Sequence, residues 1–227
     1  KTEWGFDERY IGMVIAMSCV LVILIEMPLV AARYSLAGVV TTVDAEHGAR
    51  FEYRSIETDV LAHAMERVTG LRLADLVSQE LWQKLGAEED ACFTVDRADY
   101  ALADGGFNAT LRDFARFGQL HLQGGARDGK QIIPKAWIKD IRSGGHGLFN
   151  DTGREFLPNG RYRNQFWVED ASQETVMCIG VFGQLIYIAP QDKMVVVKLS
   201  TWPDFVDLTH KRNTLRAIHA IARAHAT

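Results

Sequence analysis

Residues 48–59 read Gly-Ala-Arg-Phe-Glu-Tyr-Arg-Ser-Ile-Glu-Thr-Asp, and this pattern predicts a short strand that runs directly into a helix. The two aromatic residues alternate with charged ones, as on a half-buried strand. Ser55 is a good helix N-cap, because its hydroxyl can accept a backbone N–H that the first turn leaves unpaired. Glu57 and Asp59 then favour the positive end of the helix dipole. The junction therefore holds Tyr53 on a fixed backbone just ahead of a helix.

A tyrosine in this position has two interpretations. Tyrosine acts as a general base where neighbouring positive charge lowers the pKa of its phenol. The alternative is a half-buried strand tyrosine beside an ordinary helix cap. Local sequence leaves both open for Tyr53.

Composition and charge limit the classes of protein to which this chain can belong. The chain has 227 residues, of which 48% are apolar and 24% charged, an ordinary globular composition for one or two domains. A net charge of -4 with scattered Lys and Arg gives no electrostatic reason to expect nucleic acid. Three cysteines without a Cys-x-x-Cys argue against a disulfide framework and favour a reducing, cytoplasmic compartment. The seven histidines show no metal-ligand spacing, so no metal is expected.

An apolar run covers residues 11–32 and is long enough to cross a bilayer. Glu26 lies inside it, and a carboxylate there costs about 2.5 kcal/mol or more. Pro28 would break or kink a helix. Three interpretations stay open: a membrane span, a buried apolar element, or sequence foreign to the fold such as a frame-shifted patch. We therefore divide the chain into an atypical segment, 1–34, and a main domain, 35–227.

The sequence of the main domain predicts helices in its first part and a sheet in its second part. Four helices are expected before the sheet. The first starts after Ser55 and ends at Gly70, and the second covers 73–85. The third starts at a capping box of Thr110 and Asp113, and the fourth covers 134–141. After a loop over 143–163 come strands at 165–169, 175–181, 184–188 and 193–199, and a last helix at 209–226. Short connections between consecutive strands mean an antiparallel sheet. The expected fold class is α+β, an antiparallel sheet flanked by helices.

In this order the chain resembles the serine β-lactamase-like hydrolases, most closely their 6-aminohexanoate-dimer (nylon oligomer) hydrolase branch. The resemblance covers about residues 46–202. It is carried by Phe51-Glu-Tyr53-Arg-Ser55 with Thr58-Asp59, Glu66-Arg67-Val-Thr-Gly70, Ala103 to Gly106 with Thr110-Leu-Arg-Asp113, Gly180-Val181-Phe182-Gly183-Gln184, and Val197-Lys-Leu-Ser200-Thr-Trp202. It implies a β-lactamase/transpeptidase-like fold.

The resemblance also implies an acyl-enzyme mechanism without metal or organic cofactor. A serine in a Ser-x-x-Lys motif attacks an amide or ester carbonyl of a small molecule, and a tyrosine moves the protons. Tyr53 matches that tyrosine, and Ser55 matches the polar residue two positions after it. The backbone N–H of Val181 matches one oxyanion-hole donor on the strand that borders the cleft. Asp104 matches a substrate-pocket residue, and Tyr10 lies in a short match to a pocket loop.

Two departures from the family pattern shape the expected function. None of the seven serines has Lys three residues on, and in the family the nucleophile lies upstream of the tyrosine. We therefore expect the C-terminal part of a hydrolase that is inactive alone. Phe182-Gly183-Gln184 stands where classical β-lactamases have Lys-Thr-Gly, which argues against strong binding of penicillin-type carboxylates and favours small linear amides or esters. The alternative is a non-catalytic binding module, tethered to a membrane by residues 11–32. The oligomeric state is left open.

Overall fold

The computed structural model describes residues 53–144 and 156–225. Tyr10 and the apolar run at 11–32 lie outside these ranges, so the predictions made for them stay predictions. Within the two ranges, no helix combines the length and the apolar character that a bilayer crossing needs.

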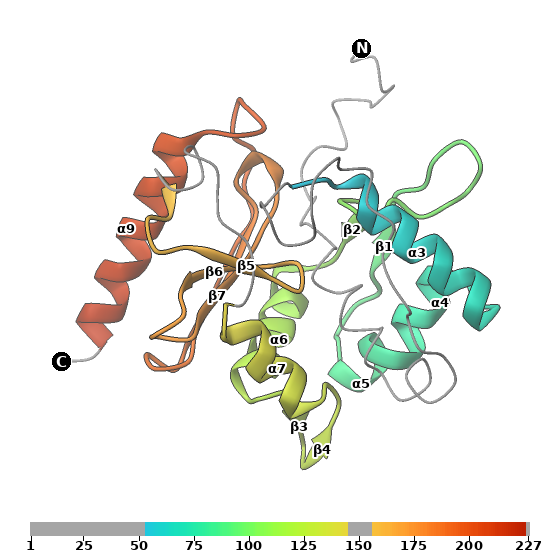
Figure 1. Ribbon diagram of the computed structural model, residues 1–227, viewed down its shortest axis with the longest axis horizontal. Coiled ribbons are helices and arrows are strands. Elements are labelled where there is room, and N and C mark those ends of the chain that lie inside the picture. Colours follow the sequence, from blue (N-terminus) through green and yellow to red (C-terminus); the bar gives the residue numbers. More distant parts are fainter. Residues whose placement is uncertain (1–52, 145–155, 226–227) are drawn as a thin grey trace, which may run out of the picture.

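An antiparallel sheet of five strands forms the centre of the fold (Figure 1). Each strand pairs with the next one along the chain, in the order β5-β6-β7-β8-β9. The strands are β5 Arg161–Arg163, β6 Phe166–Asp170, β7 Thr175–Ile179, β8 Leu185–Ala189 and β9 Met194–Lys198. The predicted antiparallel sheet is thus confirmed, with β5 added from the predicted loop.

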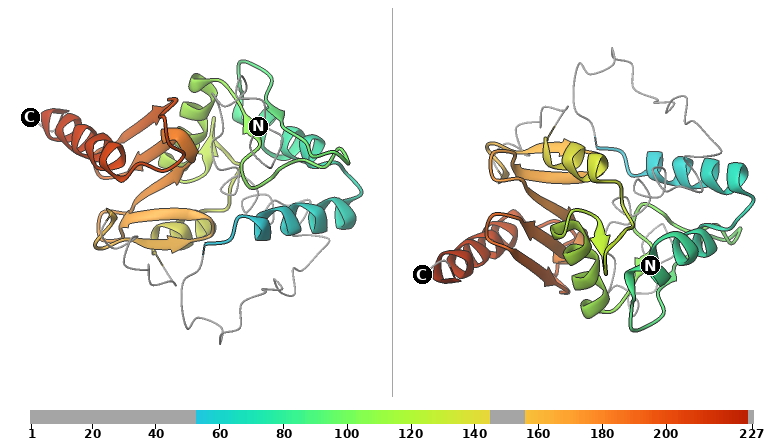
Figure 2. Two further views of the ribbon diagram at one scale, coloured as in Figure 1. Left: turned by 90° about the horizontal axis from the view of Figure 1, so that it is seen from above. Right: turned by 90° about the horizontal axis from the view of Figure 1, so that it is seen from below.

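Helices cover both faces of this sheet (Figures 1 and 2). Alternate residues of β8 belong to two separate apolar clusters, because successive side chains of a strand point to opposite faces. Helix α9 (Leu208–His225) packs on one face, and α6 (Leu111–Leu122) with α7 (Lys135–Arg142) on the other. Gly118 lets α6 approach the sheet closely, since a Cβ there would overlap a methyl of Val195.

The remaining helices form a lobe beside the sheet. Helix α3 (Ile56–Thr69) ends at Gly70, which takes the left-handed conformation that was expected of a C-cap. The predicted helix at 73–85 is one helical segment with a π-turn in its middle: α4 Leu73–Val77, the π-turn Ser78–Trp82 and α5 Gln83–Leu85. Two small hairpins complete the described chain: β1 Cys92–Phe93 with β2 Phe107–Asn108, and β3 Ala126–Arg127 with β4 Lys130–Gln131.

Local sequence signals for helix starts had mixed success. The capping box before α6 is confirmed, because the Thr110 hydroxyl accepts a hydrogen bond from the Asp113 N–H at 3.1 Å. The prediction that Ser55 caps α3 with its hydroxyl is wrong: its backbone is already helical and its side chain makes no capping bond. Tyr53 lies outside any strand of the described residues.

His121 in α6 gives the fold a built-in sensitivity to acid. Its ring lies between Phe117 and Phe166, with centroid distances of 4.8 and 4.9 Å. Burial, and then the nearby positive charge of Arg142, lowers the pKa of His121 to about 3. The unfolded chain binds this proton near pH 6.5. The neutral ring therefore stabilises the fold fully above about pH 6.5, and this stability is lost as the pH falls toward 3.

We expect His121→Leu to flatten the fall in the free energy of unfolding between pH 6.5 and 3. Urea denaturation at a series of pH values measures this directly. His225→Leu is the control, because His225 is exposed at the end of α9. A His121→Leu profile as steep as that of the unsubstituted chain would contradict the assignment.

Candidate functional site

Tyr53 lies on the surface immediately before α3 and leans against the sheet. Its ring stacks on Trp167 of β6, with centroids 5.8 Å apart and planes 26° apart. It meets Tyr162 of β5 edge-on at 6.0 Å. Tyr53 keeps 45% of its surface exposed, so it is not packed in the core. The aromatic contacts therefore hold the ring against the sheet while it keeps part of its surface exposed.

Ser55 and Asp104 meet across 49 residues of sequence. The Ser55 hydroxyl donates a hydrogen bond to the Asp104 carboxylate. One turn further along α3, Asp59 Oδ1 accepts the backbone N–H groups of Ala103 and Asp104 at 2.8 and 3.1 Å. These bonds tie the 103–106 loop to the start of α3. Two of the predicted site residues, Ser55 and Asp104, thus lie together, and Ser55 is two residues from Tyr53 in the chain.

The carboxylates of Asp59 and Asp104 favour a positively charged group next to the 103–106 loop. Burial raises the pKa of Asp104 above its ordinary value, with the Ser55 hydrogen bond acting in the opposite direction. Burial, and then the nearby charge of Asp104, raises the pKa of Asp59. Both shifts mean that ionising these groups is costly in the absence of a cation. A positively charged group beside Asp104 would relieve that cost.

Val181 lies in a tight 3₁₀ turn between β7 and β8. The strand predicted over 175–181 ends at Ile179, so the structure places Val181 in this turn rather than on a strand. Neighbouring N–H groups are used internally: Gly180 donates to the carbonyl of Gln184, and Phe182 to that of Phe205, both at 3.0 Å. Within the described residues, the Val181 N–H donates to no backbone carbonyl.

A polar network on β9 and the residues after it holds this turn in an unusual conformation. Phe182 and Gly183 have φ values of 54° and 86°, in the region that side chains disfavour. The Ser200 hydroxyl donates to the Phe182 carbonyl at 2.9 Å. Lys198 Nζ donates to the Gly183 carbonyl at 3.0 Å and to the Ser200 hydroxyl at 2.5 Å. Buried Gln184 accepts the Ser200 N–H at 2.9 Å. Burial lowers the pKa of Lys198.

The sheet connects the two halves of the candidate site. Trp167, under the Tyr53 ring, lies directly opposite Met177 in the β6–β7 register. Strand β7 then leads within a few residues into the turn that carries Val181. Tyr53 therefore lies against β6, and the neighbouring strand β7 leads into the turn with the candidate oxyanion donor Val181. The roles of Tyr53, Ser55, Asp104 and Val181 stay predictions.

Sequence reasoning missed part of this arrangement. The aromatic support from Trp167 and Tyr162 follows from strand pairing, which no local pattern reveals. The Lys198–Ser200 pair joins the last residue of β9 to a residue beyond the strand, so the strand pattern did not reveal it.

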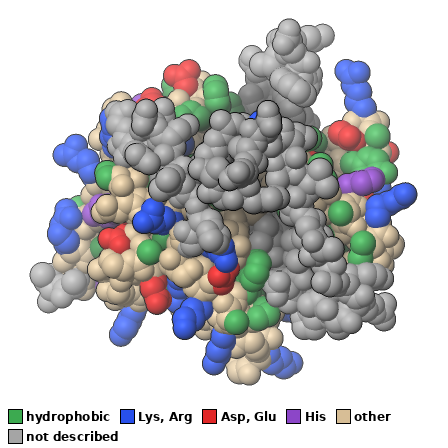
Figure 3. Space-filling view, viewed as in Figure 1, with side chains coloured by type: hydrophobic (Ala, Val, Ile, Leu, Met, Phe, Trp, Pro, Cys, Tyr) green, Lys and Arg blue, Asp and Glu red, His purple; other side chains and the backbone are tan. Residues whose placement is uncertain are grey.

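Charged side chains of both signs occur on the described surface. On the face shown in Figure 3, Lys and Arg side chains are interspersed with acidic and hydrophobic ones. Over residues 53–144 and 156–225, no cluster of three His, Cys, Asp or Glu side chains could hold a metal ion.

Comparison with known proteins gives matches over most of the chain. The family model described as Beta-lactamase matches residues 36–221. A 6-aminohexanoate-dimer hydrolase of Paenarthrobacter ureafaciens is 38% identical over 167 residues, which are 72% of this chain and 43% of the relative. A solved structure of a putative 6-aminohexanoate-dimer hydrolase from Bacillus anthracis is 34% identical, with a TM-score of 0.68, and the match covers 79% of this chain and 45% of that one.

A more distant structure shows the fold alone. A putative β-lactamase from Bacteroides dorei is 14% identical, with a TM-score of 0.63, over 88% of this chain and 84% of that one. The chain spans less than half the length of the two 6-aminohexanoate-dimer hydrolases it matches. The family match, the shared fold and the order of the quoted motifs agree, and the chain belongs to the β-lactamase family of serine hydrolases.

Proposed function

We propose that this chain is the proton-transfer and substrate-binding part of a hydrolase that cleaves small linear amides or esters through an acyl-serine intermediate. Tyr53 accepts the proton of the attacking serine and donates it to the leaving group as the amide or ester bond breaks. The Val181 N–H stabilises the oxyanion that forms on the substrate carbonyl. Ser55 and Asp104 hold one end of the substrate.

The observation that carries this proposal is the placement of Tyr53. Its ring is fixed between α3 and the sheet by Trp167 and Tyr162, yet nearly half of it is exposed. The structural alternative was a half-buried tyrosine on a strand, whereas Tyr53 lies outside any strand of the described residues. The name of the 38% identical relative, 6-aminohexanoate-dimer hydrolase, makes a linear amide built from ω-amino acids the first substrate to test.

The attacking serine is not supplied by these 227 residues, which contain no Ser-x-x-Lys. Ser200, whose hydroxyl lies next to a lysine, does not replace it, because that hydroxyl is already bonded to the Phe182 carbonyl. Catalytic groups of serine hydrolases act as a unit, and loss of the nucleophile removes nearly all of the rate. We therefore propose that the chain alone does not turn over.

A serine-reactive fluorophosphonate probe tests the proposal. The 227-residue chain should stay unlabelled. A chimera that places the upstream segment of the Paenarthrobacter ureafaciens relative ahead of residues 46–227 should be labelled at the serine of its Ser-x-x-Lys and should hydrolyse 6-aminohexanoate dimer or 4-nitrophenyl butyrate. Labelling of the 227-residue chain at any one of its own serines would overturn the proposal.

A further inference from the structure

The peptide group that carries the Val181 N–H is restrained from both of its ends. The Gly180 N–H donates to the Gln184 carbonyl at 3.0 Å, and the Gln184 N–H donates to the Val181 carbonyl at 3.3 Å. A peptide group is planar and turns only about the bonds that flank it. The direction of the Val181 N–H therefore depends on the shape of the whole turn, including residues 182 and 183.

Phe182 gives the turn its shape in a conformation that an isolated chain would avoid. Its φ of 54° is unfavourable for a residue with a side chain, and such a conformation persists only where the surroundings hold it. The segment after β9 supplies the holding contacts. The Phe182 carbonyl accepts the Trp202 N–H at 3.2 Å and the Ser200 hydroxyl at 2.9 Å. The Phe182 N–H donates to the Phe205 carbonyl at 3.0 Å.

Lys198, the last residue of β9, adds a positive charge to these contacts. Its ammonium group donates to the Gly183 carbonyl at 3.0 Å and to the Ser200 hydroxyl at 2.5 Å. The Ser200 hydroxyl in turn donates to the Phe182 carbonyl, so the ammonium holds one carbonyl directly and the other through Ser200. Hydrogen bonds from an ionised donor are about twice as strong as neutral ones, and bonds in a chain polarise one another.

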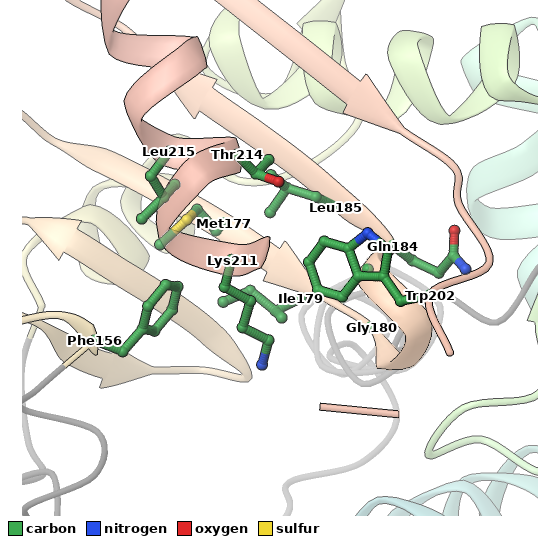
Figure 4. A pocket seen from close by; sticks show the side chains of 11 residues that line it. Phe156, Met177, Ile179, Gly180, Gln184, Leu185, Trp202, Lys211, Thr214 and Leu215 are labelled. Carbon is green, nitrogen blue, oxygen red and sulfur yellow. The ribbon is translucent and has the colours of Figure 1, made fainter. Parts of the chain in front are cut away.

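The remaining surroundings of the ammonium group also belong to the turn. It lies 4.3 Å from the centroid of the Trp202 ring, a distance at which the ring attracts a cation. This ring packs against Gly183, and Figure 4 shows it next to Gln184 at the end of the turn. Burial lowers the pKa of Lys198, because the partly buried charge loses hydration that an apolar side chain would not need. That cost is explained if the charge holds the turn.

We propose that Lys198 is the positioning residue of the Val181 turn. Its ammonium group, with Ser200 as intermediary, fixes the carbonyls of Phe182 and Gly183 and thereby sets the direction of the Val181 N–H. Lys198 acts from behind the turn and does not touch the substrate. The inference rests on the proposed function, because it takes the Val181 N–H as the oxyanion donor, and it adds a requirement for positive charge at the end of β9.

Amide hydrogen exchange in the 227-residue chain, followed by NMR, tests the positioning directly. Lys198→Met keeps the length of the side chain and removes the charge. The N–H groups of Phe182 and Gln184 should then exchange about tenfold faster or more, because the turn opens locally, while that of Ile188 in β8 keeps its rate. Lys193→Met is the matched control, since Lys193 is exposed on the β8–β9 turn, and it should leave all three rates unchanged.

Chemical rescue separates the charge from the space that the side chain fills. Alkylation of Lys198→Cys with 2-bromoethylamine rebuilds an ammonium group at nearly the original length, and slow exchange at Phe182 should return. Cys92 is exposed and also reacts, so the unsubstituted chain treated in the same way is the reference. A side chain that only filled space would not respond to the restored charge.

Kinetics of the active chimera connect the turn to catalysis. Lys198→Met should lower kcat by about tenfold or more and leave KM unchanged, because the oxyanion forms only in the transition state. Unchanged exchange in Lys198→Met, exchange that the rebuilt ammonium does not slow, or fast exchange with an unchanged kcat would each overturn the positioning role. A chimera that hydrolyses nothing would instead count against the proposed function, while the exchange rates still decide whether Lys198 holds the turn.

Discussion

Tyr53→Phe is expected to lower kcat/KM of the active chimera by about 10²- to 10⁴-fold, the range that a positioned acid–base group contributes. The substitution removes only the phenolic hydroxyl. The ring can still stack on Trp167 and meet Tyr162 edge-on, so the surroundings of the site should be preserved. Loss of activity would then report on proton transfer rather than on packing.

Steady-state hydrolysis of 6-aminohexanoate dimer measures the effect, with KM and kcat determined separately. Because the hydroxyl acts during bond making and breaking, the loss should fall on kcat. Tyr100→Phe is the control: Tyr100 is exposed and contacts His63 and Arg72 away from the sheet. A Tyr53→Phe chimera that keeps its kcat would remove Tyr53 from the mechanism.

The sequence predicted the fold well where structure follows from local pattern. The 3.6-residue period of apolar residues predicted α3, α6 and α9, and alternating apolar residues predicted β6 to β9. The π-turn at Ser78–Trp82 was not visible, since one widened turn barely changes the apolar spacing. β5 was missed because three residues within a polar loop carry no strand pattern.

The site was harder to predict, because its contacts join distant parts of the chain. Ser55 looks like a helix cap in the local sequence, but its hydroxyl bonds to Asp104 instead. The local strand–helix pattern raised Tyr53 as one of two interpretations, and family resemblance was needed to choose between them and to supply Val181.

Gly183→Ala is expected to lower the free energy of unfolding by about 3 kcal/mol, the sum of a left-handed backbone penalty and overpacking. Gly183 has φ 86°, and a Cβ built there would overlap both the Trp202 ring and the Ser200 hydroxyl. The Ser200 hydroxyl cannot move without losing its bonds to the Phe182 carbonyl and to Lys198. The added methyl group should therefore displace the whole turn and with it the Val181 N–H.

Gly129→Ala separates the two causes. Gly129 has a similar φ of 75°, but a Cβ there would meet nothing within 4 Å, so only the backbone penalty of about 1 kcal/mol should appear. Urea denaturation of both variants gives the difference. In the active chimera, Gly183→Ala should also reduce kcat by about 10²-fold or more through the lost oxyanion donor, while Gly129→Ala leaves kcat unchanged. If Gly183→Ala were no more harmful than Gly129→Ala in either measurement, the turn would not be held by the Ser200 and Lys198 network, and Val181 would have no fixed N–H to offer the substrate.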